Sequence, residues 1–226
     1  MKNKELLDDN TVLAFNSWQR WFHIHLIHFV VLFILTGLPI LSSSFSFLGE
    51  FYQWVYGLLT GKETTYSDGI VFAQMLHRGI SFLFMATIVP FVIVMLKDIK
   101  NWHVFPEKGG SIAEGIKQLN VAYIDGKHGK FGKFNMGQKL MAWTMIAAVS
   151  ALVISGVMLM GNFLVEWARL LHVVAFAGMI VALVFHIHFA TLPVNRKAFW
   201  AMFRDGKLPM EEVKKHHPLW YEKLKK

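Results

Sequence analysis

The chain has 226 residues, of which 54% are hydrophobic, and its formal net charge at pH 7 is +8. This profile is typical of an integral membrane protein, and the length is short for more than one membrane domain. The chain has no cysteine, which excludes disulfides, thiolate catalysis, iron–sulfur clusters ligated by this chain and covalent attachment of c-type haem. The excess of basic residues is not accompanied by a nucleic-acid recognition motif. We therefore expect these residues to interact with the anionic headgroups of the lipid bilayer and not with nucleic acid.

Four apolar windows are long enough to cross a bilayer as helices. We predict spans at about 22–41, 72–96, 140–160 and 170–192. The predicted fold class is therefore all-α, with a four-helix transmembrane bundle over residues 22–192. Residues 1–21 form a segment before this domain, and residues 193–226 form a basic tail after it.

The distribution of lysine and arginine predicts the orientation of these spans. Basic residues are frequent in the 97–139 connection and after residue 192, and scarce in the 42–71 and 161–169 connections. By the positive-inside rule, the N-terminus, the 97–139 loop and the C-terminus lie in the cytoplasm. We expect a multi-pass protein of the bacterial cytoplasmic (inner) membrane.

Two of the connections are predicted to contain short helices. Residues 47–59 are rich in aromatic side chains and favour a helix lying in the membrane interface. A docking surface for an extramembrane partner is the alternative for this stretch. In the 97–139 loop, Ser111 followed three residues later by Glu114 is a helix-start signal.

The last span carries histidines in an almost unbroken apolar stretch, residues 171–190. His172 and His186 are 14 positions apart, which is only about 40° short of four helical turns and a rise of roughly 21 Å. The two imidazoles therefore share one face of the helix at opposite membrane depths. Ionisable groups in a spanning helix usually face the bundle interior, so this pair indicates a functional site.

Alternation of helix direction places two further histidines at matching depths. His23 lies near the cytoplasmic start of the first span, at the depth of His186, and His77 lies near the outer start of the second span, at the depth of His172. Two depths, each with histidines on two helices, are what two bis-histidine b-type haems require. We predict that His23 and His186 ligate an inner haem and that His77 and His172 ligate an outer haem.

Three nearby histidines are not assigned to a haem. His25 and His28 lie roughly 200° and 140° around the helix from His23, so the three cannot face one site. His188 also stays without a role. One alternative to haem ligation is a haem-free membrane anchor, in which the histidines only form hydrogen bonds between helices. A transporter that uses them for metal ions or protons is another, which the scarcity of intramembrane carboxylates disfavours.

Arginines near the predicted ligands are candidate partners of the haem propionates. Arg20 precedes His23 by three residues and Arg169 precedes His172 by three, about one turn toward the nearer membrane surface. Arg78 adjoins His77 and is a third candidate. Ordinary snorkelling to the headgroups is the alternative for each.

Five short motifs are spread over nearly the whole chain. They are R-W-F-H at 20–23, M-L-H-R-G at 75–79, K-F-N-M-G-Q-K at 133–139, L-L-H at 170–172 with His186 after it, and K-K-H-H-P-L-W-Y at 214–221. These motifs resemble those of the cytochrome b (gamma) subunit of membrane-bound respiratory formate dehydrogenases. The histidine spacing alone is also similar to that of hydrogenase and thiosulfate reductase cytochromes.

The resemblance implies a quinone-reducing diheme subunit of a larger oxidoreductase, without a catalytic residue of its own for oxidising the primary donor. It would take electrons from an iron–sulfur subunit and deliver them to menaquinone near the cytoplasmic face. The iron–sulfur subunit would in turn receive them from a catalytic molybdenum or tungsten subunit. By motif, Asn135 and Gly137, with Gln138 beside them, would line the menaquinone site. A helix-start signal is the alternative for these residues. The primary donor, the direction of electron flow, the type of quinone and a higher oligomer of the complex stay open.

Overall fold

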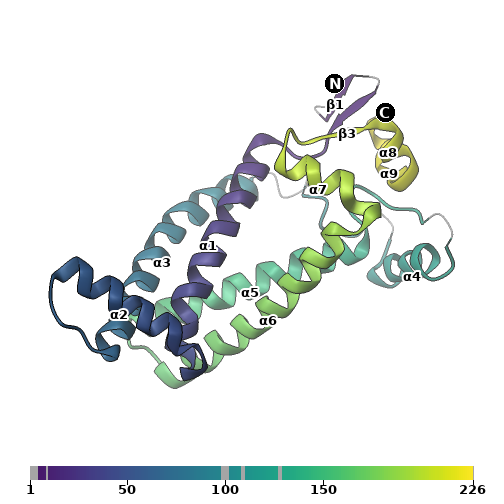
Figure 1. Ribbon diagram of the computed structural model, residues 1–226. Helices are drawn as coiled ribbons and strands as arrows, with labels where there is room; N and C mark the ends of the chain where they lie inside the picture. Colours follow the sequence, from purple (N-terminus) through teal and green to yellow (C-terminus); the bar gives the residue numbers. More distant parts are fainter. Residues whose placement is uncertain (1–4, 9, 98–101, 108–109, 127–128, 226) are drawn as a thin grey trace. The chain divides into compact units, whose positions relative to one another are not determined.

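The computed structural model describes residues 5–8, 10–97, 102–107, 110–126 and 129–225, and it is mostly helical (Figure 1). Four helices are long and apolar enough to cross a membrane, which confirms the four predicted spans. They are α1 (Ser17–Leu41), α3 (Tyr66–Leu96), α5 (Met136–Met160) and α6 (Val165–Thr191).

Each long helix begins four to six residues before its predicted window, whereas its end agrees within one residue. The cause is polar residues in the first turn, which a hydropathy window does not include. At α3, Thr65 and Asp68 form a capping box in which each side chain accepts a hydrogen bond from the other's backbone N–H. Asn16 with Gln19 and Asn135 with Gln138 form the same reciprocal box at α1 and α5.

Shorter helices lie between and after the spans. The predicted helices in the two long connections are confirmed as α2 and α4, and Ser111 caps α4 by accepting from the backbone N–H of Glu114 at 3.1 Å. The tail folds into helices that were not predicted. The bounds are α2 (Ser46–Thr60), α4 (Ile112–Tyr123), α7 (Arg196–Phe203), α8 (Met210–His216) and α9 (Pro218–Leu224), with 3₁₀ turns η1 (Ser43–Phe45) and η3 (Pro193–Asn195).

The prediction of an all-α chain missed a small sheet that joins the two ends of the sequence. Its antiparallel strands are β1 (Leu6–Asp8), β2 (Thr11–Leu13) and β3 (Lys207–Pro209), in the order β1-β2-β3. Val12 lies opposite Leu208, and both are buried, whereas their strand neighbours alternate toward the surface. Pairing between residues so distant in sequence leaves no local hydrophobic period, and three-residue strands are too short to show one.

The strands and the helices α7, α8 and α9 form one folded part, which we call the terminal module. Its buried core is Val12, Ala14, Ala201, Leu208, Val213, Trp220 and Leu224. The 193–226 region is therefore folded onto the N-terminal residues.

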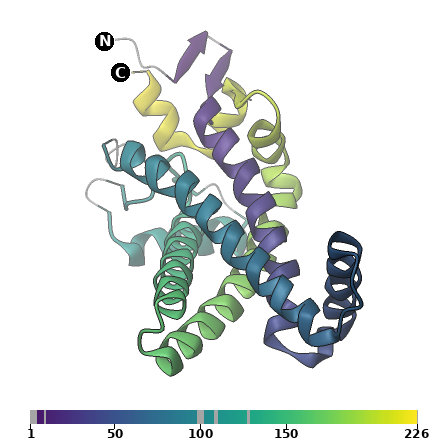
Figure 2. The ribbon, with the colours of Figure 1, turned by 90° about the vertical axis from the view of Figure 1, so that its left-hand side faces the viewer.

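The chain divides into two compact units, one of residues 21–99 and one of residues 1–20 with 100–226. In the first, helix α2 packs on α3, where a Cβ at Gly69 would lie 2.5 Å from the carbonyl oxygen of Gly49, so glycine is required. Helix α1 runs beside α3 (Figure 2), with Phe22 stacked on Phe91 at a ring distance of 3.5 Å.

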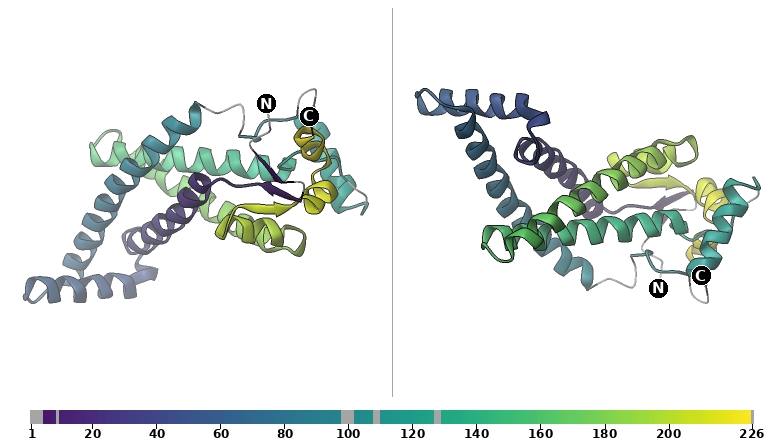
Figure 3. Two further views of the ribbon diagram at one scale, coloured as in Figure 1. Left: turned by 90° about the horizontal axis from the view of Figure 1, so that it is seen from above. Right: turned by 90° about the horizontal axis from the view of Figure 1, so that it is seen from below.

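The second unit is built around α5 and α6, which lie side by side as an antiparallel pair (Figure 3). A short turn at residues 161–164 joins them. The terminal module and α4 belong to the same unit. Each unit therefore supplies two of the four spanning helices.

Candidate functional site

His77 lies in α3 with its ring held by a hydroxyl on α1. Its Nδ1 lies 2.9 Å from Thr36 Oγ1, and the ring centroid lies 5.1 Å from that of Phe33. Gly37, the residue after Thr36, leaves room for the ring, because a Cβ there would lie 3.3 Å from His77 Cε1. The imidazole is thus fixed through one ring nitrogen and one edge.

His172 is held in the same way in the other unit. Its Nδ1 lies 2.9 Å from Ser155 Oγ on α5, and a Cβ at Gly156 would lie 3.7 Å from its Cε1. A histidine that binds a metal through one ring nitrogen usually bonds a protein group through the other. Both predicted ligands of the outer haem meet this condition.

The predicted ligands of the inner haem are His23, in the second turn of α1, and His186, in the last turns of α6. Both are half-buried. Each predicted pair takes one histidine from each compact unit, so both pairings stay predictions.

The three unassigned histidines either bond within their own helix or are exposed. His25 Nδ1 lies 2.7 Å from the carbonyl oxygen of Trp21 one turn earlier, and its ring stacks on that indole. His28 and His188 are exposed. A bond within its own helix gives His25 a structural role.

The three candidate arginines differ in their surroundings. Arg20 donates from Nη1 to the carbonyl of Arg204, and its Nε is buried with no hydrogen-bond partner among the residues that the structure describes. Arg169 lies 3.8 Å from Glu166 on the surface, and Arg78 is exposed. Binding of haem propionates stays a prediction for all three, and the buried Nε of Arg20 fits it best.

Asn135 and Gln138 act at the start of α5, as the alternative interpretation predicts. Asn135 Oδ1 accepts from the backbone N–H of Gln138, and Gln138 Oε1 accepts from that of Asn135, both at 2.9 Å. Gly137 is exposed in the first turn. The quinone role of the three residues stays a prediction.

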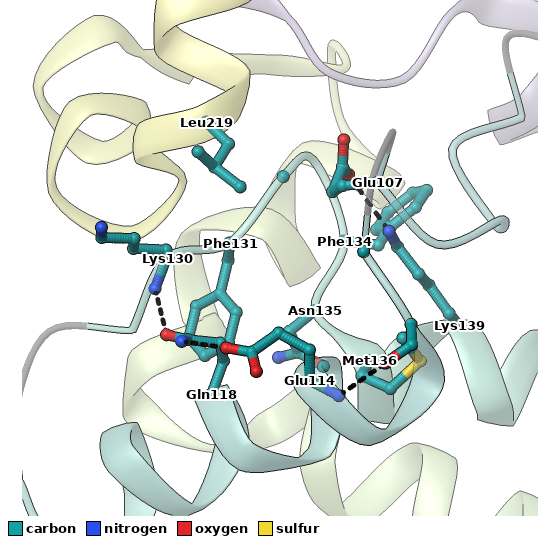
Figure 4. A pocket seen from close by; sticks show the side chains of 14 residues that line it. Glu107, Glu114, Gln118, Lys130, Phe131, Phe134, Asn135, Met136, Lys139 and Leu219 are labelled. Atoms are coloured by element: carbon teal, nitrogen blue, oxygen red, sulfur yellow. Dashed lines mark hydrogen bonds and ion pairs between the residues drawn. The ribbon is translucent and has the colours of Figure 1, made fainter.

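A pocket of about 260 Å³ lies beside Asn135 and Met136, between the start of α5 and the α4 segment (Figure 4). Glu107 lines it and pairs with Lys139 at 3.1 Å and with Lys223. Burial would raise the pKa of Glu107, but these two ammonium groups reverse that effect and hold the pKa below its ordinary value. The carboxylate is therefore ionised at neutral pH.

The K-K-H-H-P-L-W-Y motif holds the terminal module against the segment before α5, which sequence reasoning missed. His217 Nδ1 donates to the carbonyl of Gly132 at 2.9 Å, and the backbone N–H of Leu219 donates to Phe131 at 3.0 Å. Trp220 is buried and donates to Glu5. The sequence signal that could have indicated this packing was Trp220, a large aromatic residue within a segment rich in charged residues.

The same arrangement places Gln138 and His217 on the wall of a second, smaller cavity of about 40 Å³. The residues of the 133–139 motif thus line two cavities at the start of α5, with Asn135 on one and Gln138 on the other.

Comparison with known proteins gives a family match and a set of distant relatives. The chain is 29% identical over 108 residues to the nitrate-inducible formate dehydrogenase cytochrome b556(Fdn) subunit of Escherichia coli strain K12, covering 42% of this chain and 46% of that protein. It is 29% identical over 118 residues to the formate dehydrogenase cytochrome b556(fdo) subunit of the same organism, covering 49% and 54%. The formate dehydrogenase cytochrome b556 subunit of Haemophilus influenzae is 25% identical over 156 residues, covering 61% and 60%.

The chain spans about half the length of the curated relatives it matches, so these similarities are partial. The family model described as prokaryotic cytochrome b561 matches residues 14–205, which include all four spanning helices and the predicted histidine ligands. The chain belongs to this family of prokaryotic membrane cytochromes of the b type.

Proposed function

We propose that this protein is the diheme cytochrome b subunit of a formate dehydrogenase-like respiratory complex. It takes electrons from an iron–sulfur subunit outside the membrane and passes them to menaquinone near the cytoplasmic face. Three findings support this: the family match over residues 14–205, the relatives named as formate dehydrogenase cytochromes, and the hydroxyl-held imidazoles of His77 and His172. The family match carries the proposal, because histidines bonded to a neighbouring helix would also occur in a haem-free membrane anchor.

The residues present fit haem. His77 and His172 would hold one haem, and His23 and His186 would hold the other, through their imidazole nitrogens. Bound haem b supplies one-electron transfer at each site. Glycines on the histidine-bearing helices leave space for a flat group, since a Cβ at Gly79 or Gly178 would meet nothing within 4 Å. Arg20, whose Nε is buried, would bind a propionate through its guanidinium.

Asn135, Gly137 and Gln138 would line the quinone site at the cytoplasmic end of α5. Because Asn135 Oδ1 holds the helix start, a bond to a quinone carbonyl would come from the amide NH₂ of this residue. Gly137 carries no Cβ and is exposed, so it permits a close approach of the ring to the backbone. Protons for quinone reduction enter here from the cytoplasm, and charge separation follows without a pump.

The complex would contain an iron–sulfur subunit and a catalytic molybdenum or tungsten subunit, with formate as the primary donor. A hydrogenase or thiosulfate reductase cytochrome is the alternative within the same class. Purification of the protein with its neighbours and reduction of its haem by formate, hydrogen or a sulfur donor separates them. Reduction by hydrogen but not by formate would replace the formate assignment.

The direct test is the visible spectrum and haem content of the purified full chain. We expect b-type bands on reduction and two haems per chain. His172→Ala should remove the outer haem and His186→Ala the inner one. His188→Ala is the matched control, because this histidine is exposed on the same helix, and it should keep both. A chain without haem bands would be a haem-free membrane anchor.

A further inference from the structure

Two hydroxyl groups in the spanning helices occupy the same position relative to a predicted haem ligand. Thr36 is 2% exposed and Ser155 is 0% exposed, although both lie in helices whose surfaces are largely uncovered. Each oxygen lies 2.9 Å from the Nδ1 of a histidine on the neighbouring helix, His77 and His172 respectively.

The hydrogen bonds within each helix fix where the protons lie. A hydroxyl group has a single proton to donate. Thr36 Oγ1 lies 2.7 Å from the carbonyl oxygen of Leu32, an acceptor that has no proton, so the hydroxyl proton points there. The contact with His77 then needs its proton from the imidazole, and Nδ1–H is the donor.

The proton positions at Ser155 and His172 are fixed in the same way. Ser155 Oγ lies 2.6 Å from the carbonyl oxygen of Ala151 and donates to it. His172 Nδ1–H therefore donates to Ser155. In a neutral imidazole with its proton on Nδ1, the lone pair is on Nε2, which is the atom that would bind iron.

Each hydroxyl is followed by a glycine that faces the same ring. A Cβ at Gly37 would lie 3.3 Å from His77 Cε1, closer than ordinary packing, and one at Gly156 would lie 3.7 Å from His172 Cε1. Thr36-Gly37 and Ser155-Gly156 are thus equivalent pairs, in which the first residue orients the ring and the second lets it approach.

We propose that Thr36 and Ser155 are positioning residues for the outer haem, which set the tautomer of both axial histidines and the basicity of their Nε2 atoms. This inference rests on the proposed function, in which His77 and His172 are axial ligands. An acceptor at Nδ1–H makes the imidazole more basic, which stabilises the oxidised iron. Loss of either hydroxyl should therefore shift the reduction potential of the outer haem to more positive values.

The test is a potentiometric titration of haem in the purified full chain, followed by its visible spectrum and combined with measurement of haem retention. Thr36→Val and Ser155→Ala should each shift the same one of the two haem transitions upward. Each should also weaken retention of that haem by about 10- to 100-fold, as loss of an outer-shell partner does at other metal sites. Thr36→Ser and Ser155→Thr keep the hydroxyl and should titrate like the wild type.

Ser81→Ala is the matched control. Ser81 donates to the backbone carbonyl of His77 at 2.8 Å, so this variant removes a helix hydroxyl beside the same histidine without touching its ring. Both potentials should stay unchanged.

The outcomes separate the inference from the proposed function. A wild-type chain without haem overturns both. Unchanged potentials and retention in Thr36→Val and Ser155→Ala, with two haems bound, overturn the positioning role alone. Equal shifts in Thr36→Val and Thr36→Ser also overturn it, because they indicate a packing effect. Shifts in two different transitions contradict the assignment of both residues to one haem.

Discussion

Trp220 donates its indole Nε1–H to Glu5 Oε2 at 2.9 Å, joining residues from opposite ends of the chain. Glu5 also accepts from Lys133 Nζ at 2.6 Å, so one carboxylate connects the N-terminal strand region, the segment before α5 and the terminal helix α9. The terminal module thus depends on residues that are distant in sequence.

The hydrogen bond from the Trp220 indole to Glu5 should contribute to the stability of the terminal module in addition to the burial of the ring. Trp220→Phe keeps an aromatic ring but removes the donor to the Glu5 carboxylate, and a hydrogen bond to such a group is worth about 1.5–3 kcal/mol. We expect a loss of that order in the free energy of opening of the terminal module, measured by hydrogen exchange. Trp220→Ala should lose about 3–5 kcal/mol.

Trp200→Phe is the control for this change, because Trp200 is 43% exposed in the same module. It should alter the opening free energy by less than about 1 kcal/mol. Equal losses for Trp200→Phe and Trp220→Phe would show that the bond to Glu5 contributes nothing.

Gly206 is the glycine on which the entry into β3 depends. Its φ is +80°, and a Cβ on it would lie 1.9 Å from the carbonyl oxygen of Phe15. Its own carbonyl accepts from the backbone N–H groups of Ala14 and Phe15 at 2.8 and 3.0 Å. Gly206→Ala therefore combines a left-handed conformation with a backbone clash.

We expect Gly206→Ala to lower the thermal stability of the purified chain more than Gly61→Ala does. Gly61 has φ +66° with nothing within 4 Å of a Cβ, so its substitution carries only the conformational cost, about 1–2 kcal/mol. The difference between the two variants measures the clash. A Gly61→Ala chain that is the less stable of the two would contradict this account.

These elements show where sequence reasoning succeeds and where it stops. The four spans are readable because lipid requires long apolar runs, and His172 and His186 share a face through helical period alone. Thr36 and Ser155 were missed, since single hydroxyl residues in a span are ordinary and only the structure shows which ring they face. The sheet was missed because residues 11–13 pair with residues 207–209 across almost the whole sequence.

The terminal module should weaken in mild acid. Burial lowers the pKa of His217, partly opposed by its bond to the Gly132 carbonyl, and burial also lowers the pKa of His103, with Lys133 adding to the effect. In the unfolded chain both titrate near about 6.5. Below that pH the unfolded form binds more protons than the folded form. The free energy of unfolding of the module therefore decreases as the pH decreases.

The measurement is the opening free energy of the module between pH 7.5 and pH 5, by hydrogen exchange corrected for the intrinsic pH dependence of exchange. We expect protection of α9 to decrease across this window. His217→Asn cannot gain the proton and should reduce the dependence to the contribution of His103. Protection that increases as the pH falls would show that the charged form of His217 is stabilised in the folded module.

Asn135 has two separable tasks, the helix start and the proposed bond to quinone. Asn135→Ala removes both, with a capping cost of about 1 kcal/mol, whereas Asn135→Ser keeps a capping oxygen and removes only the amide. We expect both variants in the intact complex to slow quinone reduction by roughly two- to tenfold, the kinetic equivalent of one neutral hydrogen bond. Haem reduction by the primary donor should continue at the wild-type rate.

Asn16→Ala is the matched control for that prediction, because Asn16 and Gln19 form the same capping box at α1, with bonds of 3.0 and 2.9 Å. It should cost similar stability and leave quinone reduction unchanged. If Asn135→Ser reduces quinone like the wild type while Asn135→Ala is impaired, the residue acts only as a helix cap. Equal impairment in Asn16→Ala would likewise show that helix stability, and not the amide, determines the rate.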